Sequence, residues 1–339
     1  MIRNETTATL RICGAVLGFS LLAAVATPAR AVPAFFGAAR VVPLVYAVNQ
    51  GGFTATAYRE SARGNVPPAL AIAGTRTQIF EPNGLAVSPT GKVAISQSDG
   101  TADPQNILEY APGASGNAAP IATIRCAGFG GPPEQVAFDA HGNLYAEYAQ
   151  LPRQGSGAIE IFAPSEQSGC VKDKHVIFGT RTGVSPAGDG ITVAGGMIYD
   201  ASSDAVREFR TTDSGNVAPR IIIQGPNTGL QDARGLSVDS AGYLYVANLT
   251  NVLIFSPSAH GDVTPVAVIA GSRTQFVDAT SVAVSRDGRI FVANSSGCCG
   301  STDNILVFAK GAHGNASPLQ VISGPNTGLH GIAEIALLE

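Results

Sequence analysis

The stretch that decides the fold is Gly235-Leu236-Ser237-Val238-Asp239-Ser240-Ala241-Gly242-Tyr243-Leu244-Tyr245-Val246-Ala247-Asn248, followed closely by Val252-Leu253-Ile254-Phe255. Short runs rich in β-branched, Leu and Tyr residues, separated by Gly, Asp and Asn, predict β-strands joined by tight turns. A loop from Gly261 to Pro265 and an apolar run from Val266 to Ala270 complete the unit. The stretch therefore predicts four short strands in succession.

This four-strand unit recurs along the chain. We predict first strands beginning at Gly84, Gln135, Gly190, Gly235 and Ser281. Loops of the type Gly-Asn-x-x-Pro begin at Gly64, Gly116, Gly215 and Gly314. Threonines in Gly-x-x-Thr recur at one loop position, which predicts a shared backbone turn: Thr77, Thr182, Thr228, Thr274 and Thr327. Four strands in a unit of roughly 45 to 55 residues are typical of a propeller blade.

The two ends of the chain predict how the ring closes. Val45–Asn49 matches a second strand, so the first unit lacks its first strand. Glu334–Leu337 matches the first strand Gly235–Val238, because a Thr-Gly-Leu segment precedes both at the same distance. We therefore predict an all-β, six-bladed β-propeller of four-stranded blades over residues 44–339. Pairing of the C-terminal strand with the N-terminal strands closes it and removes two sheet edges.

The N-terminus has the pattern of a secretory signal peptide over residues 1–31, followed by a lead-in over 32–43. Arg3 and Arg11 precede the apolar run Ile12–Val25, and Ala29-Arg30-Ala31 is a small-x-small cleavage site. We expect cleavage after Ala31, with Ala26 as the alternative site, and a secreted or periplasmic protein without a transmembrane span after signal removal. A membrane anchor is the other interpretation, but the run is shorter than the about 20 residues that a span needs.

The four cysteines after this segment permit disulfides in an exported chain. Cys126–Cys170 is one possible pair and the adjacent Cys298–Cys299 another, with free thiols as the alternative. The cysteines lack metal-ligand spacing, since the sequence has no C-x-x-C and no H-E-x-x-H.

Charge and composition exclude some classes of function. Charged residues make up 14% of the chain, the formal net charge is −4, and no basic run occurs. A nucleic-acid footprint needs such a run, so we expect no nucleic-acid partner. No Gly-x-Ser-x-Gly elbow stands at a strand-to-helix turn. We expect a monomer.

The unit Gly-Leu-Ser-Val-Asp-Ser-Ala-Gly-Tyr-Leu-Tyr-Val-Ala-Asn followed by Val-Leu-Ile-Phe resembles the NHL repeat over nearly the whole mature chain. NHL-like propellers include binding scaffolds, lyases and the related SMP-30/gluconolactonase type of metal-dependent lactonase. That last resemblance implies a divalent cation at the channel mouth, held by an acidic residue, an Asn and an Asp. The acidic-Gly-Pro-x-Trp segment associated with the lactonases is missing, because the chain has no Trp.

Strand counting gives the candidate site residues. The residues before the first strands are Asn83, Glu134, Asp189, Arg234 and Thr280, and those ending the second strands are Asn49, Gln97, Tyr148, Asn248 and Asn294. Both sets are expected near the central channel on one face. Glu134 and Asp189 with an Asn are the candidate Ca²⁺ ligands, since Ca²⁺ takes oxygen ligands. The alternative is that these groups line a wet channel and satisfy strand ends.

Three long loops on the same face are the second reason to expect a ligand there: Ser98–Asn106, Ala149–Gly157 and Ser295–Asn304. The ligand site is predicted over Asn49, Asp99, Asp103, Glu134, Tyr148, Arg153, Asn294 and Asp303. Surface decoration without function is the alternative. The leading hypothesis is an exported scaffold that binds a protein, peptide, glycan or small molecule. A lactonase-like hydrolase or a lyase is the second, and a structural cell-surface repeat protein is the third.

Overall fold

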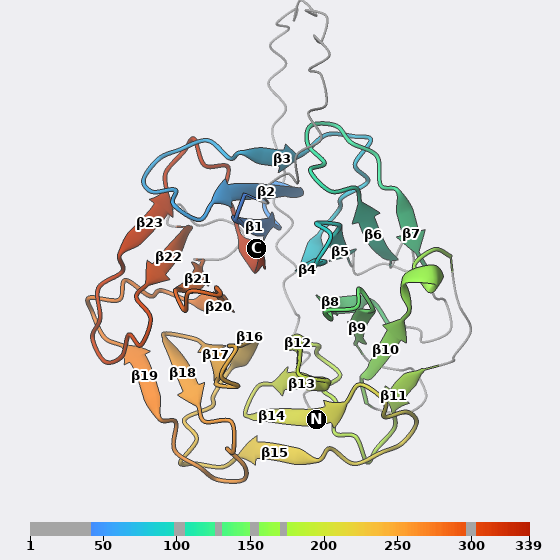
Figure 1. The fold of residues 1–339 in the computed structure, drawn as a ribbon, viewed down its shortest axis with the longest axis vertical. Coiled ribbons are helices and arrows are strands. Elements are labelled where there is room, and N and C mark those ends of the chain that lie inside the picture. The colour runs from blue at the N-terminus through green and yellow to red at the C-terminus, as the bar shows by residue number, and fades with distance from the viewer. Residues whose placement is uncertain (1–41, 98–105, 126–130, 150–155, 170–174, 296–302) are drawn as a thin grey trace, which may run out of the picture. The chain divides into compact units, whose positions relative to one another are not determined.

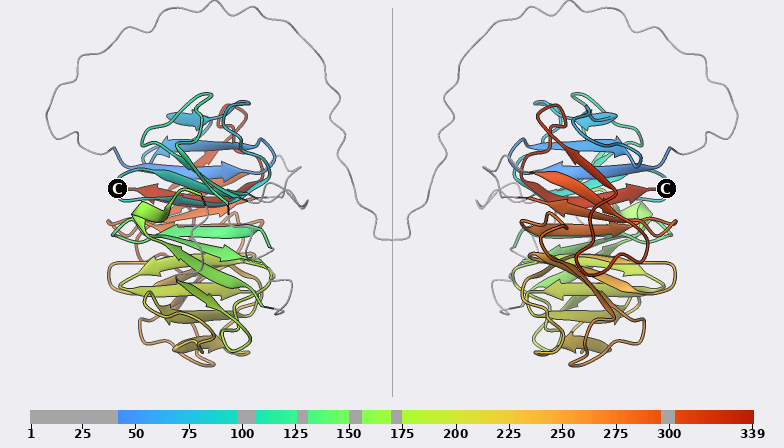
Figure 2. Two further views of the ribbon diagram at one scale, coloured as in Figure 1. Left: turned by 90° about the vertical axis from the view of Figure 1, so that its right-hand side faces the viewer. Right: turned by 90° about the vertical axis from the view of Figure 1, so that its left-hand side faces the viewer.

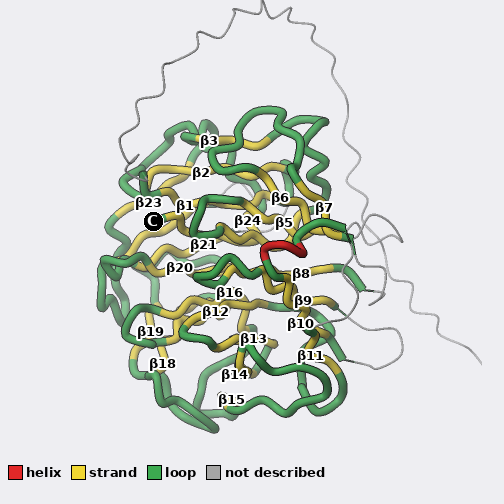
Figure 3. Tube along the Cα trace, turned by 45° about the vertical axis from the view of Figure 1, so that its right-hand side comes forward, coloured by secondary structure: helices red, strands yellow, loops and turns green. Residues whose placement is uncertain are grey.

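The computed structural model describes residues 42–97, 106–125, 131–149, 156–169, 175–295 and 303–339. They form six four-stranded antiparallel sheets, which are arranged around a ring like the blades of a propeller (Figure 1). The strands run from one face of the ring to the other (Figure 2). Within the described part of the chain, the one helical segment is the 3-10 turn Pro164–Glu166 (Figure 3). The prediction of an all-β, six-bladed propeller is confirmed.

We number the blades from the composite one and name the strands of each blade from the channel outward. Blade 1 contains β24 (Ile332–Leu338), β1 (Leu44–Asn49), β2 (Thr54–Arg59) and β3 (Leu70–Ile72), and blade 2 contains β4 (Pro82–Val87), β5 (Val93–Gln97), β6 (Asn106–Tyr110) and β7 (Ala122–Ile124). Blade 3 contains β8 (Pro133–Phe138), β9 (Leu144–Tyr148), β10 (Ala158–Phe162) and β11 (Val176–Phe178), and blade 4 contains β12 (Gly190–Ala194), β13 (Met197–Ser202), β14 (Ala205–Arg210) and β15 (Ile221–Gln224). Blade 5 contains β16 (Ala233–Val238), β17 (Leu244–Asn248), β18 (Asn251–Phe255) and β19 (Ala267–Ala270), and blade 6 contains β20 (Ala279–Val284), β21 (Ile290–Asn294), β22 (Asn304–Phe308) and β23 (Gln320–Ser323).

The C-terminal strand closes the ring as predicted. β24 pairs antiparallel with β1, from Leu44 opposite Leu338 to Asn49 opposite Ile332. Ile332 and Ile335 are buried and pack with Val45 and Ala47 between blades 6 and 1. The last strand of the chain therefore supplies both hydrogen bonds and core to the first blade.

Four first strands begin two residues earlier than the sequence predicts, and the reason is a β-bulge. The register with the second strand shifts between Pro82 and Gly84, and the same shift occurs in blades 3, 5 and 6. A β-bulge places two residues of one strand opposite a single residue of its partner. The extra residue is unpaired, and its side chain departs from the regular alternation. The extra residues are Asn83, Glu134, Arg234 and Thr280.

The core lies between the blades rather than in one central mass. Each of the six junctions between neighbouring blades has its own cluster of buried apolar side chains. Near the channel the first strands approach so closely that side chains do not fit everywhere. A Cβ atom on Gly235 would lie 2.4 Å from the Cα of Ser281 in the next blade. Glycine at the start of this strand is therefore required by backbone packing.

The Gly-Asn-x-x-Pro loops join the blades at their outer ends. In all six junctions a glycine at this position forms a parallel bridge to the fourth strand of the preceding blade, as Gly116 does with Ile72; four of the six belong to Gly-Asn-x-x-Pro, and Gly261 begins the related Gly-Asp-Val-Thr-Pro. In five of the six junctions the following Asn or Asp accepts a hydrogen bond from the turn after that strand. Examples are Arg76 N to Asn117 Oδ1 and Arg273 N to Asn315 Oδ1, both 2.7 Å. The glycine bridge and the Asn or Asp hydrogen bond thus connect neighbouring blades, and we call this pair of contacts the latch.

The five Gly-x-x-Thr segments form the shared turn that the sequence predicts. In each, the threonine hydroxyl donates to the glycine carbonyl over 2.7 Å, and its oxygen accepts from a backbone N–H two residues further on.

Among the described residues, no helix has the length and apolar character to cross a bilayer.

Candidate functional site

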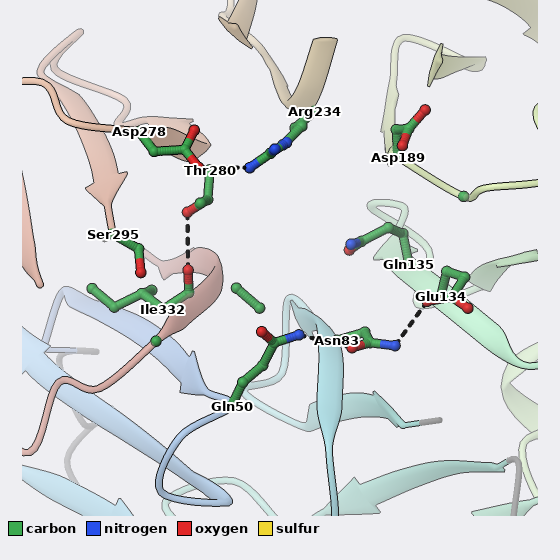
Figure 4. A pocket seen from close by; sticks show the side chains of 13 residues that line it. Gln50, Asn83, Glu134, Gln135, Asp189, Arg234, Asp278, Thr280, Ser295 and Ile332 are labelled. Atoms are coloured by element: carbon green, nitrogen blue, oxygen red, sulfur yellow. Dashed lines mark hydrogen bonds and ion pairs between the residues drawn. The ribbon is translucent and has the colours of Figure 1, made fainter. Parts of the chain in front are cut away.

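A cavity of about 300 Å³ opens at one mouth of the central channel (Figure 4). Every blade contributes to its wall, since the lining residues come from the starts of the first strands and the loops beside them. They are Gln50, Asn83, Glu134, Gln135, Gly188, Asp189, Arg234, Asp278, Thr280, Ser295, Gly331, Ile332 and Ala333. The five residues that strand counting places before the first strands all line this one cavity.

The β-bulges explain why these side chains meet. Asn83, Glu134, Arg234 and Thr280 are the extra residues of their strands, and Ala333 is the extra residue of β24. Each lines the cavity. A repeated backbone irregularity thus turns one residue in each of five blades toward the channel mouth, whereas β12 of blade 4 pairs without a bulge.

A chain of hydrogen bonds follows one side of the cavity. Gln50 Nε2 donates to Asn83 Oδ1 over 2.9 Å, and Asn83 Nδ2 donates to Glu134 Oε2 over 2.7 Å (Figure 4). These contacts fix the Glu134 carboxyl and link the walls of blades 1, 2 and 3.

Arg234 is the one cationic side chain that the described residues contribute to the lining, and its charge is already matched. It lies 2.6 Å from Asp232 and 3.0 Å from Asp278, measured between nitrogen and carboxylate oxygen. These two acids raise the pKa of Arg234 against the opposing effect of burial. The guanidinium is therefore held between two carboxylates rather than offered to an anion.

The wall at blades 3 and 4, next to Arg234, carries the carboxyl groups of Glu134 and Asp189. Burial raises the pKa of Glu134 to about 7, and the nearby Asp189 adds to the rise. Burial also raises the pKa of Asp189, although it accepts a hydrogen bond from Ser203 N. Gly188 separates this wall from a deeper acid, since a Cβ there would lie 2.5 Å from Glu134 Cβ and 3.8 Å from Glu147 Cδ.

Glu147 on β9 and Asp200 on β13 meet behind this wall, in the interface between blades 3 and 4. Both residues are fully buried, and no donor from the described part of the chain reaches any of their four carboxyl oxygens. Burial and mutual repulsion raise the pKa of Glu147, with further contributions from Asp189 and Glu134. Burial also raises the pKa of Asp200, while Arg207, 3.9 Å away, opposes the rise. Two buried carboxyls that repel each other favour the state in which one of them is protonated.

Sequence inspection singled out neither Glu147 nor Asp200. The available signal was the register of the second strands. Glu147 stands opposite Gln135, in the place where Ala293 stands opposite Ser281 in blade 6. A carboxylate in a position that is small and apolar in another blade marks a departure from the repeat.

Four predicted site residues lie inside the protein and do not line the cavity: Asn49, Tyr148, Asn294 and Asp303. Tyr148 belongs to the apolar cluster between blades 2 and 3. Asn49 donates to the hydroxyls of Thr54 and Thr56.

Two of these residues hold cavity-lining backbone in place. Asn294 Oδ1 accepts from Val277 N and Asp278 N, at 2.6 and 3.2 Å. Asp303 accepts from the Ser295 hydroxyl and from Gly331 N, at 2.8 and 2.7 Å. Asn248 binds the backbone before Arg234 in the same way as Asn294. These three buried side chains hold the backbone at the mouth of the cavity in place by hydrogen bonds.

Several predictions fall outside the described residues and stay predictions. They are the ligand contacts of Asp99, Asp103 and Arg153, the disulfides Cys126–Cys170 and Cys298–Cys299, and the signal peptide over residues 1–31.

The predicted Ca²⁺ ligation by Glu134 and Asp189 with an Asn stays a prediction. Glu134 and Asp189 share a wall, but in the described ranges no group of three or more His, Cys, Asp or Glu is arranged to hold a metal ion. We derive no metal-dependent step from this site.

Comparison with solved structures shows the fold. A Bacteroides caccae protein of unknown function has 9% identity and a TM-score of 0.63, covering 88% of this chain and all of its own. A Lactobacillus plantarum protein has 14% identity and a TM-score of 0.55, covering 88% of this chain and 99% of its own. The WD40 propeller domain of Doa1 has 11% identity and a TM-score of 0.51, covering 83% and 79%. No protein-family model and no curated protein sequence matches the chain. At these identities the likeness extends to the fold alone.

Proposed function

We propose that this propeller is a binding scaffold whose channel mouth takes a small cationic group, an ammonium or a guanidinium. The observation that carries the proposal is the acidic wall at blades 3 and 4, where Glu134 and Asp189 face the cavity. The buried carboxyl pair Glu147 and Asp200 lies behind them. A cation that enters would meet carboxylates in a partly dry site, where Coulomb attraction is stronger than in water.

The charges elsewhere in the cavity favour a cation over an anion. Arg234 is already bound by Asp232 and Asp278. The remaining polar lining groups are amides, hydroxyls and backbone, such as Gln50, Asn83 and Thr280, and Ile332 and Ala333 are apolar. These can orient a ligand by hydrogen bonds but do not neutralise an anionic one.

The test uses agmatine, which carries an ammonium and a guanidinium, in isothermal titration calorimetry. We expect binding that tightens from pH 6 to pH 8, because Glu134 ionises across its raised pKa of about 7. Glu134→Gln and Asp189→Asn should each weaken binding about tenfold, as loss of a partly buried charge partner does. The control is Glu81→Gln, since Glu81 is exposed and does not line the cavity. No heat of binding at either pH would overturn the proposal.

The lactonase-like alternative, which the resemblance to the SMP-30 type supports, needs a divalent cation. Its test is the same titration with CaCl₂ in place of agmatine, together with the metal content of the purified protein. Stoichiometric Ca²⁺ that is lost in Glu134→Gln would favour that enzyme. We further propose that the scaffold acts after export, which the signal-like pattern of residues 1–31 supports.

A further inference from the structure

Two exposed aromatic side chains lie beside the cavity. Phe53, in the β1–β2 hairpin, and Phe80, in the loop before β4, are 39% and 44% exposed. Their ring centroids are 5.0 Å apart and the rings are tilted by 45°. We call this pair the aromatic shelf.

The segments that carry the shelf also line the cavity. Phe53 follows Gln50 in the same hairpin, Phe80 lies in the loop just before Asn83 of β4, and the Gln50–Asn83 hydrogen bond joins the two segments. Asn83 then donates to Glu134. Two hydrogen-bonded side-chain amides therefore connect the segments that carry the shelf to the acidic wall.

The backbone of the shelf is in an uncommon conformation. Phe53 has φ of +50°, and Glu81, which follows Phe80, has +42°. Bulky residues rarely adopt positive φ, and it costs of order 1–3 kcal/mol where surrounding structure does not relieve it. Glycine is the natural residue for such a turn, yet the hairpin holds a phenylalanine that is not buried.

A ligand that contacts both the shelf and the cavity must extend beyond the cavity. Neither Phe53 nor Phe80 lines the cavity, whose volume of about 300 Å³ is at the lower limit for small-ligand pockets. A ligand that uses both must place a cationic group in the cavity and an apolar group outside it. Exposed aromatic side chains next to a polar recess are also what protein interfaces enrich.

We propose that the partner is a polypeptide segment that inserts a Lys or Arg side chain into the channel mouth and lays a neighbouring apolar side chain on the Phe53–Phe80 shelf. This inference rests on the proposed function, since it requires the cavity to accept a cation. The amides of Gln50 and Asn83 lie between the two subsites, where they can bond to the peptide backbone.

The experiment is fluorescence anisotropy with labelled, N-acetylated and C-amidated peptides. Each has one Arg in a Gly/Ser background and one Phe placed one to four residues away on either side. We expect one spacing to bind at least about tenfold tighter than agmatine, as an interface anchor does. In that peptide, Arg→citrulline keeps the shape, removes the charge and should abolish binding.

Variants of the shelf separate this inference from the proposed function. Phe53→Ser and Phe80→Ser should each weaken the best peptide about tenfold and leave agmatine unchanged, whereas Phe80→Leu should retain most of the affinity. Their effects should vanish when the Phe of the peptide is Ala. The matched control is Tyr243→Ser, since Tyr243 is 38% exposed in the turn between β16 and β17.

The outcomes are distinct. Agmatine binding without any gain from the peptide Phe, or equal loss of agmatine and peptide in the shelf variants, would overturn the inference and leave the proposed function standing. Failure of agmatine and of every Arg peptide would overturn both.

Discussion

Glu147 is the residue whose substitution most directly tests the buried carboxyl pair. Its side chain has three acids around it, Asp200, Asp189 and Glu134, and all of them raise its pKa. Asp200 differs, because Arg207 partly compensates it. Glu147→Gln keeps the shape and replaces the shared proton by an amide that can donate to Asp200. We expect the variant to be more stable than the wild type at pH 8, by about 1–3 kcal/mol, the cost of a buried unsatisfied polar group.

The pH dependence gives this prediction its sign. Because burial and repulsion hold the pKa values of Glu147 and Asp200 above those of the unfolded chain, the folded protein binds more protons than the unfolded one. This contribution to stability is full below the unfolded pKa values, about 4, and is lost as the pH rises through the raised ones. Urea unfolding should show that the free energy of unfolding falls less between pH 5 and pH 8 in Glu147→Gln than in the wild type. Glu81→Gln should behave like the wild type. The same change in the free energy of unfolding between pH 5 and pH 8 in all three proteins would contradict a shared proton.

At the scale of the element, the Gly-x-x-Thr turns offer a matched comparison. Thr182 is fully buried, donates to Gly179 O and accepts from Val184 N. Thr182→Val leaves the Val184 N–H without this acceptor and should lower the free energy of unfolding by about 1–3 kcal/mol. Thr182→Ser keeps both hydrogen bonds and loses one methyl, about 0.8 kcal/mol. Denaturant titration should rank wild type, Ser and Val in that order, and an equal cost for both variants would show that the hydroxyl is not what matters.

The latch between blades predicts which substitutions the Gly-Asn-x-x-Pro loop tolerates. Asn315 accepts from Arg273 N, and Asp262 accepts from Asn227 N in the equivalent place. Asn315→Asp should therefore cost little, whereas Asn315→Ala removes the acceptor and should cost about 0.5–1.5 kcal/mol. Hydrogen exchange at the Arg273 amide reports the latch itself. Unchanged protection in Asn315→Ala would contradict this role.

At the scale of the whole molecule, the repeat in the sequence was enough to predict six blades, their strand order and the closing strand. It was also enough to predict that five residues lie at one mouth of the central channel: Asn83, Glu134, Asp189, Arg234 and Thr280. It did not reveal the bulges, because one extra residue per strand leaves the apolar pattern nearly unchanged. It also did not reveal that Asn294 and Asp303 turn inward, since a polar residue at a strand end satisfies loop backbone as readily as it binds a ligand. The Glu147–Asp200 pair depends on which faces of two blades meet, a relation that no single repeat contains.

Ring closure by β24 gives the last prediction. Removing Ile332–Glu339 uncovers the edge of β1 and takes Ile332 and Ile335 out of the cluster between blades 6 and 1. An open propeller then presents an unpaired strand edge beside exposed apolar surface, which favours aggregation. We expect the truncated chain to lose cooperative thermal unfolding, and to regain it when a synthetic peptide of residues 332–339 is added in excess, because the peptide restores both the ladder and the core. The same peptide with Ile335→Asp should fail, since it buries a charge in place of an apolar side chain. A truncated chain that unfolds at the wild-type midpoint without peptide would show that closure by the last strand contributes nothing to stability.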